Sequence, residues 1–515
     1  MVRLTARRRF LIALLSGAGL SLAFLLLQDS LSAGLTWVSL ALLVSVLVGA
    51  RPWAGALYGF SCGTVYYALT LPWIYEVMRV HGGLSVGAAG AVMALVVAAC
   101  SLFFAAFGMG TAWMSGCSVA RACLTAPFLW VALEFARTRL PHIGFPWNLL
   151  GYATGNSLLL LQAAAATGIY GLSLFIAACC SFVAWVTHKA RSRTSLGVCW
   201  ILGLALVPVT TLANRWIPSE HPSHAARLVQ TNFPQSPAYP ADWMERHAGD
   251  LDELERLSVP AGEKPPGLVI WSEVPAPFSL EDPRFAARAQ QIARASQGDF
   301  LVGVVDWRPT ARGGLAPYNS AALLDASGRE VFLYDKIHLV PFGEYVPLRQ
   351  WLTFAGKLTA EVGDFQHGSE YKVGKLADGH GFGVFICYEA VFPDLVRRFT
   401  ANGAELLVNL SNDGWFGRSA APGQHLAMAR VRAVESRRWL LRVTNNGYTV
   451  VVDPYGRYTA RMAPDTRAAM TATYGVRSDL TPYARWGDWV AWLCVVVTLA
   501  MVVGRAARAD SGVES

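Results

Sequence analysis

The sequence predicts a membrane bundle of α-helices joined to an α/β domain outside the cytoplasm. Hydrophobic residues make up 54% of the 515 residues and charged residues only 15%, and the mean hydropathy is +0.36. Ordinary globular domains carry about 25% charged residues, so part of this chain belongs in lipid. One long polar region, from Asn214 to Tyr483, interrupts the apolar stretches and contains alternating strand-like and helix-like runs.

Apolar stretches predict eight membrane helices, most of them near the ~20 residues needed to cross the hydrocarbon layer. The basic start at Arg3 and Arg7 is like that of a signal peptide, but no small-residue cleavage site is clear, so we expect a retained first helix. The stretches are Phe10–Leu27, Leu35–Val48, Ala54–Tyr75, Val86–Trp113, Cys123–Phe135, Leu158–Trp185, Leu196–Leu212 and Trp486–Val503.

The positions of basic residues predict the orientation of these helices. With the N-terminus inside the cell, Arg51, Arg121, Lys189 and Arg505 all fall on the cytoplasmic side, as the positive-inside rule requires. This explains the net charge of +8, because the arginines form no basic face of the kind that binds nucleic acid. The expected division is 1–213 for seven transmembrane helices, 214–482 for the extracytoplasmic domain, 483–507 for the eighth helix and 508–515 for a cytoplasmic tail.

The polar region is long enough for one sizeable core. Mixed alternation of strands and helices, with turn signals such as Ser327-Gly328, predicts a layered α/β domain with hairpins among its strands. Strands are expected near Ala226–Gln230, Leu268–Trp271, Phe300–Val305, Ala321–Leu324, Val331–Leu333, Gly383–Ile386, Leu406–Leu410, Leu440–Val443, Val450–Val452 and Met470–Thr473. Helices are expected near Asp242–Leu257, Pro283–Ala295, Asp394–Thr400 and Gln424–Arg437.

Of the nine cysteines, only Cys387 falls in the polar region. The others lie in or next to apolar stretches, and no Cys or Cys/His spacing indicates a metal site. In an oxidising compartment a lone thiol cannot be half of an intradomain disulfide, so Cys387 needs another role. We expect neither a metal nor an organic cofactor.

Reactive side chains follow three of the predicted strands. If these strands share one sheet and one direction, their side chains meet at one edge. A free thiol is mostly protonated at neutral pH, so a nearby carboxylate can take its proton during attack, and Glu273 is the candidate base. The Lys336 ammonium and the Tyr388 N–H are candidate donors to the oxyanion, each typically worth ~3 kcal/mol. The strands and the residues they lead to are Leu268–Trp271 with Glu273, Val331–Leu333 with Lys336, and Gly383–Ile386 with Cys387.

Simpler roles are open for the same residues. Cys387 alone could be a buried structural cysteine, and Glu273 with Lys336 could be an ion pair at a sheet edge. Glu344 and Glu389 are candidates to hold the lysine and the leaving group. No Gly-x-Ser-x-Gly elbow, Gly-rich phosphate loop or His-Glu-x-x-His helix occurs, so serine hydrolase, nucleotide-binding and zinc protease functions lack support.

Two further segments are candidates for substrate contact. The loop after the fifth apolar stretch holds Arg139 and Trp147 on the far side of the membrane. Positive charge there opposes the topology rule, which leaves two alternatives, a phosphate-contacting platform and a solvated loop with an interfacial tryptophan. The apolar run Leu348–Phe354 fits either a lid dipping into the interface or an ordinary packed helix.

The motifs around these residues resemble the nitrilase superfamily: WSEVPAPF around Glu273, YDKIHLVPFGEYVP around Lys336 and ICYEAVFP around Cys387. With the flanking membrane helices, nearly the whole chain resembles the bacterial apolipoprotein N-acyltransferases. The resemblance implies an αββα sandwich set on a membrane bundle. It extends to GFPW at 144–147, LVQ at 228–230 followed by PQS at 234–236, and NLSNDGWF at 409–416.

The resemblance also implies a two-step acyl transfer without a cofactor. Cys387 would attack the sn-1 acyl ester of a phospholipid, commonly phosphatidylethanolamine, and form a thioester. The α-amino group of the S-diacylglyceryl cysteine at the start of a lipoprotein would then accept the acyl chain. Such an enzyme would be a monomer in the bacterial inner membrane, with a periplasmic domain and both termini in the cytoplasm.

Site roles follow from the same resemblance. Glu273 would be the base and Lys336 the oxyanion stabiliser, with Glu344, Tyr388 and Glu389 in support. Trp415 would belong to a mobile loop near the entrance. The family often has a lysine–tryptophan pair where this chain has Ala238-Tyr239, which makes Tyr239 the candidate replacement.

Two other functions are compatible with parts of the sequence. A membrane-anchored amidase or nitrilase would use the same three residues to hydrolyse a small C–N substrate in a closed pocket. A transporter or lipoprotein-binding scaffold would keep its function without Cys387, but the apolar stretches show few of the intramembrane charges that transport sites use.

Overall fold

The computed structural model divides the chain into two compact units. The first unit comprises residues 1–75, 87–217 and 486–515, and the second comprises residues 76–86 and 218–485. The described residues are 4–27, 31–140, 144–154, 157–189, 212–234, 239–274, 276–310, 313–341, 343–345 and 365–511.

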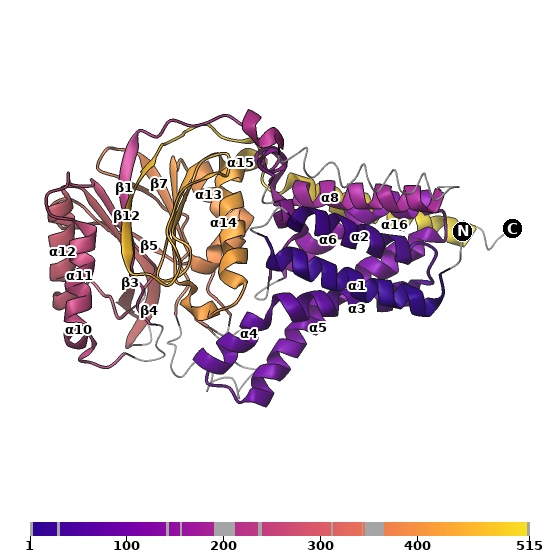
Figure 1. Cartoon of the computed structure of the whole chain (residues 1–515), viewed down its shortest axis with the longest axis horizontal. Coiled ribbons are helices and arrows are strands. Elements are labelled where there is room, and N and C mark those ends of the chain that lie inside the picture. Colours follow the sequence, from indigo (N-terminus) through magenta and orange to yellow (C-terminus); the bar gives the residue numbers. More distant parts are fainter. Residues whose placement is uncertain are drawn as a thin grey trace. The chain divides into compact units, whose positions relative to one another are not determined.

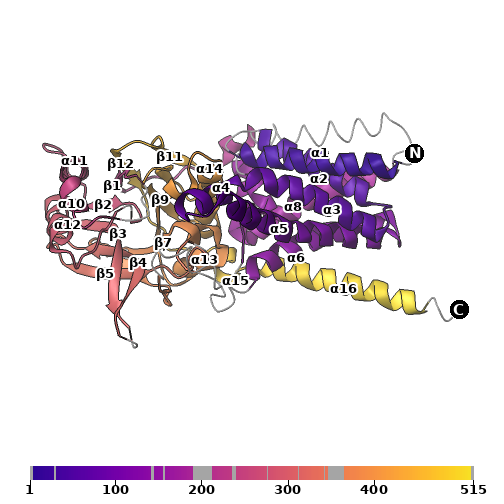
Figure 2. The same ribbon diagram turned by 90° about the horizontal axis from the view of Figure 1, so that it is seen from below.

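The first unit is a bundle of helices (Figures 1 and 2). Five of its described helices are long and apolar enough to cross a membrane, and α2 is a shorter apolar helix. The seventh predicted stretch lies almost wholly outside the described residues, so the count of eight spans stays a prediction. The main helices are α1 (Ala6–Leu25), α2 (Leu31–Leu47), α3 (Pro52–Thr70), α5 (Val86–Ser115), α6 (Val119–Arg139), α8 (Ala164–Lys189) and α16 (Trp489–Ser511).

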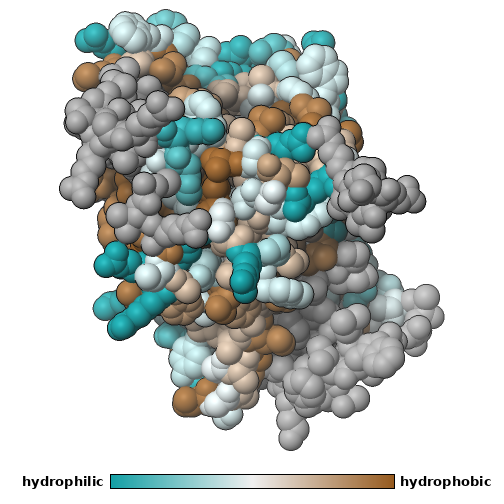
Figure 3. Space-filling view, turned by 90° about the vertical axis from the view of Figure 1, so that its right-hand side faces the viewer, coloured by the Kyte–Doolittle hydropathy of each residue, from teal (hydrophilic) through white to brown (hydrophobic). Residues whose placement is uncertain are grey.

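Two features of these helices suit a lipid environment. Helices α3 and α5 approach closely because both carry glycine where they meet, and a Cβ on Gly55 would lie only 2.4 Å from the carbonyl oxygen of Gly108. Large apolar side chains also face outward, with Leu95 70% exposed and Leu15 67% exposed. Figure 3 shows hydrophobic residues at the surface, among hydrophilic ones. An apolar exterior of this kind favours contact with acyl chains over water.

The second unit contains two six-stranded sheets, ordered β12-β1-β2-β3-β4-β5 and β11-β10-β9-β8-β7-β6. Strands β1, β2 and β3 run parallel, as do β7, β8 and β9, and the remaining neighbours are antiparallel. The strands are β1 (His224–Gln230), β2 (Leu268–Trp271), β3 (Asp299–Pro309), β4 (Leu315–Leu324), β5 (Glu330–Asp335), β6 (Val373–Lys375), β7 (Gly381–Ile386), β8 (Leu406–Ser411), β9 (Trp439–Thr444), β10 (Val450–Val452), β11 (Tyr458–Arg461) and β12 (Ala468–Tyr474).

Alternating side chains of the strands fill separate apolar layers. In β2, Ile270 points into the core between the sheets and Val269 into the core beneath the outer helices. One outer layer is formed by α10 (Trp243–Arg246), α11 (Ala248–Ser258) and α12 (Pro283–Ser296), and the other by α13 (Pro393–Ala401) and α14 (Ala421–Ser436) (Figure 1). The result is a four-layered αββα sandwich, which confirms the predicted α/β class.

The segment Glu76–Val86 belongs to a different unit from the chain on either side of it. It lies between two helices of the bundle in sequence but belongs to the second unit. Its His81 ring packs edge-on against Trp415, with ring centroids 4.9 Å apart. The sequence separates this segment from the apolar stretches on either side, but nothing in it indicates that the segment belongs to the second unit.

Candidate active site

Cys387 lies on a tight turn between a buried strand and a short helical turn. Strand β7 is completely buried, and the 3₁₀ turn η5 (Cys387–Val391) begins at the cysteine itself. The backbone of Cys387 has a φ of +47°, which a residue with a side chain rarely adopts. Such strain persists only where surrounding structure enforces it, and it is concentrated at functional sites. Cys387 as a whole is 5% exposed.

Glu273 and Lys336 reach one another from the ends of two strands of the other sheet. Glu273 follows β2 and Lys336 follows β5, and the Lys336 Nζ donates to Glu273 Oε1 at 3.2 Å. The expectation that all three strands share one sheet is wrong, because Cys387 follows β7 of the second sheet. The two sheets pack face to face, and the site forms where their strand ends meet.

Glu344 and Asn319 complete the polar cluster around Lys336. Glu344 Oε1 accepts from Lys336 Nζ at 2.9 Å, so the ammonium lies between two carboxylates. Asn319, on β4, donates from the same Nδ2 to Glu273 Oε1 at 2.9 Å and to Glu344 Oε1 at 2.7 Å. The backbone N–H of Asn412 donates to the second oxygen of Glu273 at 2.8 Å. The position of Glu273 is therefore fixed from three directions.

The buried cluster shifts the proton affinities of its members. Burial raises the pKa of Glu273, and the Lys336 ammonium lowers it in part. Burial alone would lower the pKa of Lys336, but the two carboxylates raise it above its usual value and keep the side chain charged. Burial raises the pKa of the Cys387 thiol, and the charge of Glu273 raises it further. A thiol that stays protonated needs a base, and a carboxylate of raised pKa beside it suits that task.

Glu389 supports the turn that carries the thiol. Its side chain is completely buried, and burial raises its pKa to about 7. One oxygen accepts from the backbone N–H of Ile386 at 2.6 Å, and the other accepts from the Tyr334 hydroxyl at 2.8 Å and the Ile337 N–H at 2.7 Å. Glu389 thus joins β7 to the end of β5, which Lys336 directly follows. Tyr388, 7% exposed, packs its ring edge-on against Phe392.

A buried ionic network of His425, Asp413 and Arg442 supports the backbone of Cys387. His425 Nε2 donates to the Cys387 carbonyl oxygen at 3.0 Å. Asp413 accepts two bonds from Arg442 Nη2, at 2.9 and 2.8 Å, and all three side chains of the network are at most 2% exposed. Burial alone would raise the pKa of Asp413, but Arg442 and His425 bring it below its usual value. Burial lowers the pKa of His425, and Arg442 lowers it further.

Sequence reasoning missed the polar residues of this network and Asn319. Asp413 lies in the NLSNDGWF motif, two residues after β8, and polar residues at a strand end were the available signal. His425 lies inside α14, which is buried on nearly every side and so has no polar face for comparison. Asn319 lies within β4, where nothing local shows that its amide meets two carboxylates.

The remaining predicted site residues lie in different places. Trp415 belongs to η6 (Asp413–Phe416), next to the Asp413 network, and contacts His81. Tyr239 packs edge-on against Trp243 beneath the outer helices, and burial raises its pKa to about 12. In the first unit, Trp147 is fully buried, which does not fit an interfacial ring, and the half-exposed Arg139 pairs with Asp488 at 2.7 Å.

The predicted lid at Leu348–Phe354 lies outside the described residues. The substrate-contacting roles of Arg139, Trp147, Tyr239 and Trp415 stay predictions. What the described residues do assemble is a thiol, a carboxylate, an ammonium and buried partners that orient all three. This arrangement can transfer an acyl group through a covalent thioester.

Both units of the chain are similar to known protein families. Residues 226–481 match the family described as carbon-nitrogen hydrolase, and residues 16–182 match the apolipoprotein N-acyltransferase N-terminal domain. A protein of Geobacter metallireducens named apolipoprotein N-acyltransferase is 34% identical, over 98% of this chain and 96% of that protein. One of the same name from Methylococcus capsulatus is 33% identical, over 98% of each chain. A solved amidase from Nesterenkonia sp. is 19% identical, covers 52% of this chain and 94% of its own, and has a TM-score of 0.37.

Proposed function

Because this chain belongs to the apolipoprotein N-acyltransferase family, we propose that it transfers an acyl chain from a phospholipid to the N-terminus of a lipoprotein through a thioester on Cys387. The observation that carries the proposal is the buried contact between Glu273 and Lys336 at the strand ends next to the strained thiol turn. Membrane helices in the same chain support a lipid substrate over a small soluble amide.

In the first step, Cys387 Sγ attacks the carbonyl carbon of the sn-1 ester. Glu273 takes the thiol proton as the S–C bond forms, and the negative charge grows on the former carbonyl oxygen. Lys336 and the Tyr388 N–H stabilise that oxyanion. The C–O bond then breaks, the proton on Glu273 passes to the departing oxygen, and a lysophospholipid leaves.

In the second step, the α-amino group of the diacylglyceryl cysteine attacks the thioester carbon. Glu273 now takes a proton from the nitrogen, the C–S bond breaks, and the proton returns to the sulfur of Cys387. The products are an amide and the original thiol. The lysophospholipid product leaves before the acceptor reacts, so the kinetics are ping-pong.

The physical state of the substrates supports a site tethered to a membrane. Each buried CH₂ of an acyl chain is worth ~0.8 kcal/mol, so neither donor nor acceptor leaves the bilayer readily. We propose phosphatidylethanolamine as donor and a monomer as the active form. We also propose that the catalytic unit lies in the periplasm and both termini in the cytoplasm, in agreement with the positions of the loop arginines.

The test is intact mass spectrometry of the full chain in detergent after exposure to phosphatidylethanolamine. The native protein should gain one acyl mass that hydroxylamine removes, and Cys387→Ala should gain none. Adding a diacylglyceryl peptide should discharge the acyl mass into a peptide amide. A native protein that never gains the mass, or that discharges it only to water, would contradict transfer; the second result would indicate a hydrolase.

A further inference from the structure

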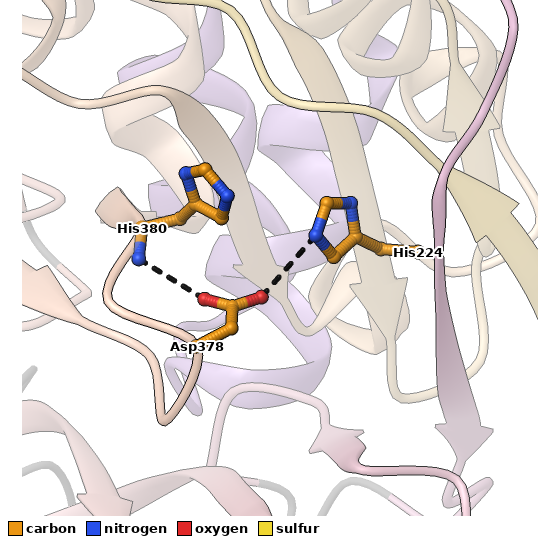
Figure 4. A group of neighbouring side chains, drawn as sticks. All are labelled: His224, Asp378 and His380. Carbon is orange, nitrogen blue, oxygen red and sulfur yellow. Dashed lines mark hydrogen bonds and ion pairs between the residues drawn. The ribbon is translucent and has the colours of Figure 1, made fainter.

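A second cluster of reactive side chains lies in the catalytic unit, away from Cys387. His224, Asp378 and His380 turn toward one another, with one ligand atom from each lying within 4.8 Å of the others (Figure 4). His224 begins β1, whereas Asp378 and His380 lie on the turn between β6 and β7. We propose that this cluster, here called the His–Asp–His site, binds one divalent transition-metal cation of the zinc type.

The spacing of the side chains suits a tetrahedral cation. Zinc binds imidazole nitrogen and carboxylate oxygen at ~2.0–2.1 Å, so two ligand atoms of a tetrahedral site lie ~3.3–3.4 Å apart. His224 Nε2 and Asp378 Oδ2 are 3.4 Å apart. The Nδ1 atom of His380 is engaged by the Glu405 carboxylate, and Figure 4 shows the ring edge that carries Nε2 turned toward His224. The ligand nitrogen of His380 lies within 4.8 Å of the ligand atoms of both His224 and Asp378.

Each histidine is oriented by a hydrogen bond on its outer nitrogen. His380 Nδ1 lies 3.0 Å from Glu405 Oε2, and His224 Nδ1 lies 2.8 Å from Ser223 Oγ. Histidines that bind metals almost always make such a bond with the nitrogen that does not face the metal, and a carboxylate partner makes the ring more basic. An incidental surface histidine has no need of this arrangement.

The backbone around Asp378 holds its carboxylate in place. Asp378 Oδ1 accepts from the His380 backbone N–H at 3.0 Å, which leaves Oδ2 facing His224. The turn itself is anchored to the other sheet, because the Ala377 N–H donates to Asp299 Oδ2 at 2.6 Å. The side chains of His224 and Asp378 are 24% and 38% exposed, so a hydrated cation can reach them.

The ligand types select among cations. Two imidazoles and one carboxylate suit Zn²⁺, Ni²⁺ or Cu²⁺, whereas Ca²⁺ and Mg²⁺ prefer oxygen ligands alone. Three protein ligands leave room for water on a tetrahedral ion. The rival arrangement is a simple ion pair between Asp378 and a protonated His224, which would need no second imidazole.

A cation at this position would link the two sheets. His224 belongs to one sheet, and the β6–β7 turn belongs to the other. His380 directly precedes β7 and Cys387 directly follows it, so the six residues of that strand, at ~3.3 Å each, separate the site from the thiol by ~20 Å. The cation would therefore act on the stability of the sandwich, and the inference does not depend on the acyl-transfer proposal.

The experiment uses the full chain in detergent, prepared without a polyhistidine tag and stripped with a chelator. After Zn²⁺ is added and excess removed by gel filtration, we expect one zinc per chain by elemental analysis and a melting temperature that rises with the Zn²⁺ concentration. His224→Ala and His380→Ala should lose both effects. Glu405→Gln should weaken zinc binding by about 10–100-fold, as loss of an outer partner does.

The matched control is His247→Gln, which removes the histidine of another His–Asp pair, with Asp250 at 2.8 Å, that lacks a second imidazole. It should bind zinc as the native chain does. The proposal fails if zinc remains bound in His224→Ala and His380→Ala, or if the native chain binds none at micromolar concentration, in which case the cluster is an ion pair only. Acyl-enzyme formation should stay normal in the alanine variants, so failure of one proposal is distinct from failure of the other.

Discussion

Replacing Asn319 with leucine tests how the buried acid cluster sets the proton affinity of the proposed base. Asn319 donates to Glu273 Oε1 at 2.9 Å, and this bond is one of the contributions that lower the Glu273 pKa. A hydrogen bond to a charged group is worth about 1.5–3 kcal/mol, and one pKa unit corresponds to 1.36 kcal/mol. Leucine has a similar volume and no donor, so the Glu273 pKa should rise by about 1–2 units.

The sign of the effect on rate follows from the role of Glu273. The base works only when ionised, so acylation slows as the pH falls through the Glu273 pKa. In Asn319→Leu this decline should begin about 1–2 pH units higher than in the native chain. At a pH below both values the variant should be about 10–100-fold slower, and at a pH above both the difference should become small.

The assay is single-turnover acylation by phospholipid, stopped at short times and read by intact mass spectrometry across the pH range. Asn402→Leu is the matched control, because its amide binds the Tyr371 carbonyl at 2.9 Å on the exterior of the same unit. Its profile should match that of the native chain. An Asn319→Leu profile with an unchanged acid limb, or with a uniform drop at every pH, would refute the proposed effect of Asn319 on Glu273.

Three further substitutions test the supports of the site. Asp413→Asn should destabilise the catalytic unit by ~3–5 kcal/mol, because it leaves the buried Arg442 without its carboxylate. The fold lowers the Asp413 pKa, so the stability that this carboxylate contributes is complete above pH ~4 and is lost as the pH falls through the lowered value. The difference in melting temperature between the variant and the native chain should therefore shrink in acid. Glu389→Gln should cost ~1–3 kcal/mol in denaturant unfolding, because an amide NH₂ would face a backbone N–H, and a variant as stable as native would contradict the assigned bonds. Gly303→Ala should lower both the melting temperature and the acylation rate, because its Cβ would lie 2.7 Å from the backbone just after β2, whereas Gly249→Ala, in open space, should be neutral or stabilising.

The class of the fold was predictable because local patterns in the sequence agree with it. Strands β2 and β10 occur where short runs of branched apolar residues predicted them, and α12 and α14 lie where helices were expected. Strands β6 and β11 were missed, since β6 is Val-Gly-Lys with no apolar run, and β11 has four residues of which only Tyr458 and Ala460 pack against the core. Edge strands of this kind are stabilised by pairing with their neighbour, which a local pattern does not contain.

The residues of the site were predictable in part, and for a similar reason. Glu273, Lys336 and Cys387 each follow a recognisable strand, so their position at strand ends could be predicted. Their distribution over two sheets could not, because sheet membership depends on pairing between distant segments. Asn319 and His425 make their contacts across 46 and 38 residues of sequence, respectively, and neither lies in a local pattern that marks it. Their catalytic roles, like those of the three central residues, stay predictions.

Segment Glu76–Val86 limits how this protein can be dissected. The catalytic fold consists of two separate pieces of chain, and the smaller piece is encoded inside the helical region. A fragment beginning at residue 218 would lose the His81 ring and uncover one edge of the Trp415 indole. Anyone designing a soluble version for crystallisation or inhibitor screening would therefore need to graft this eleven-residue piece back, for example through a flexible linker.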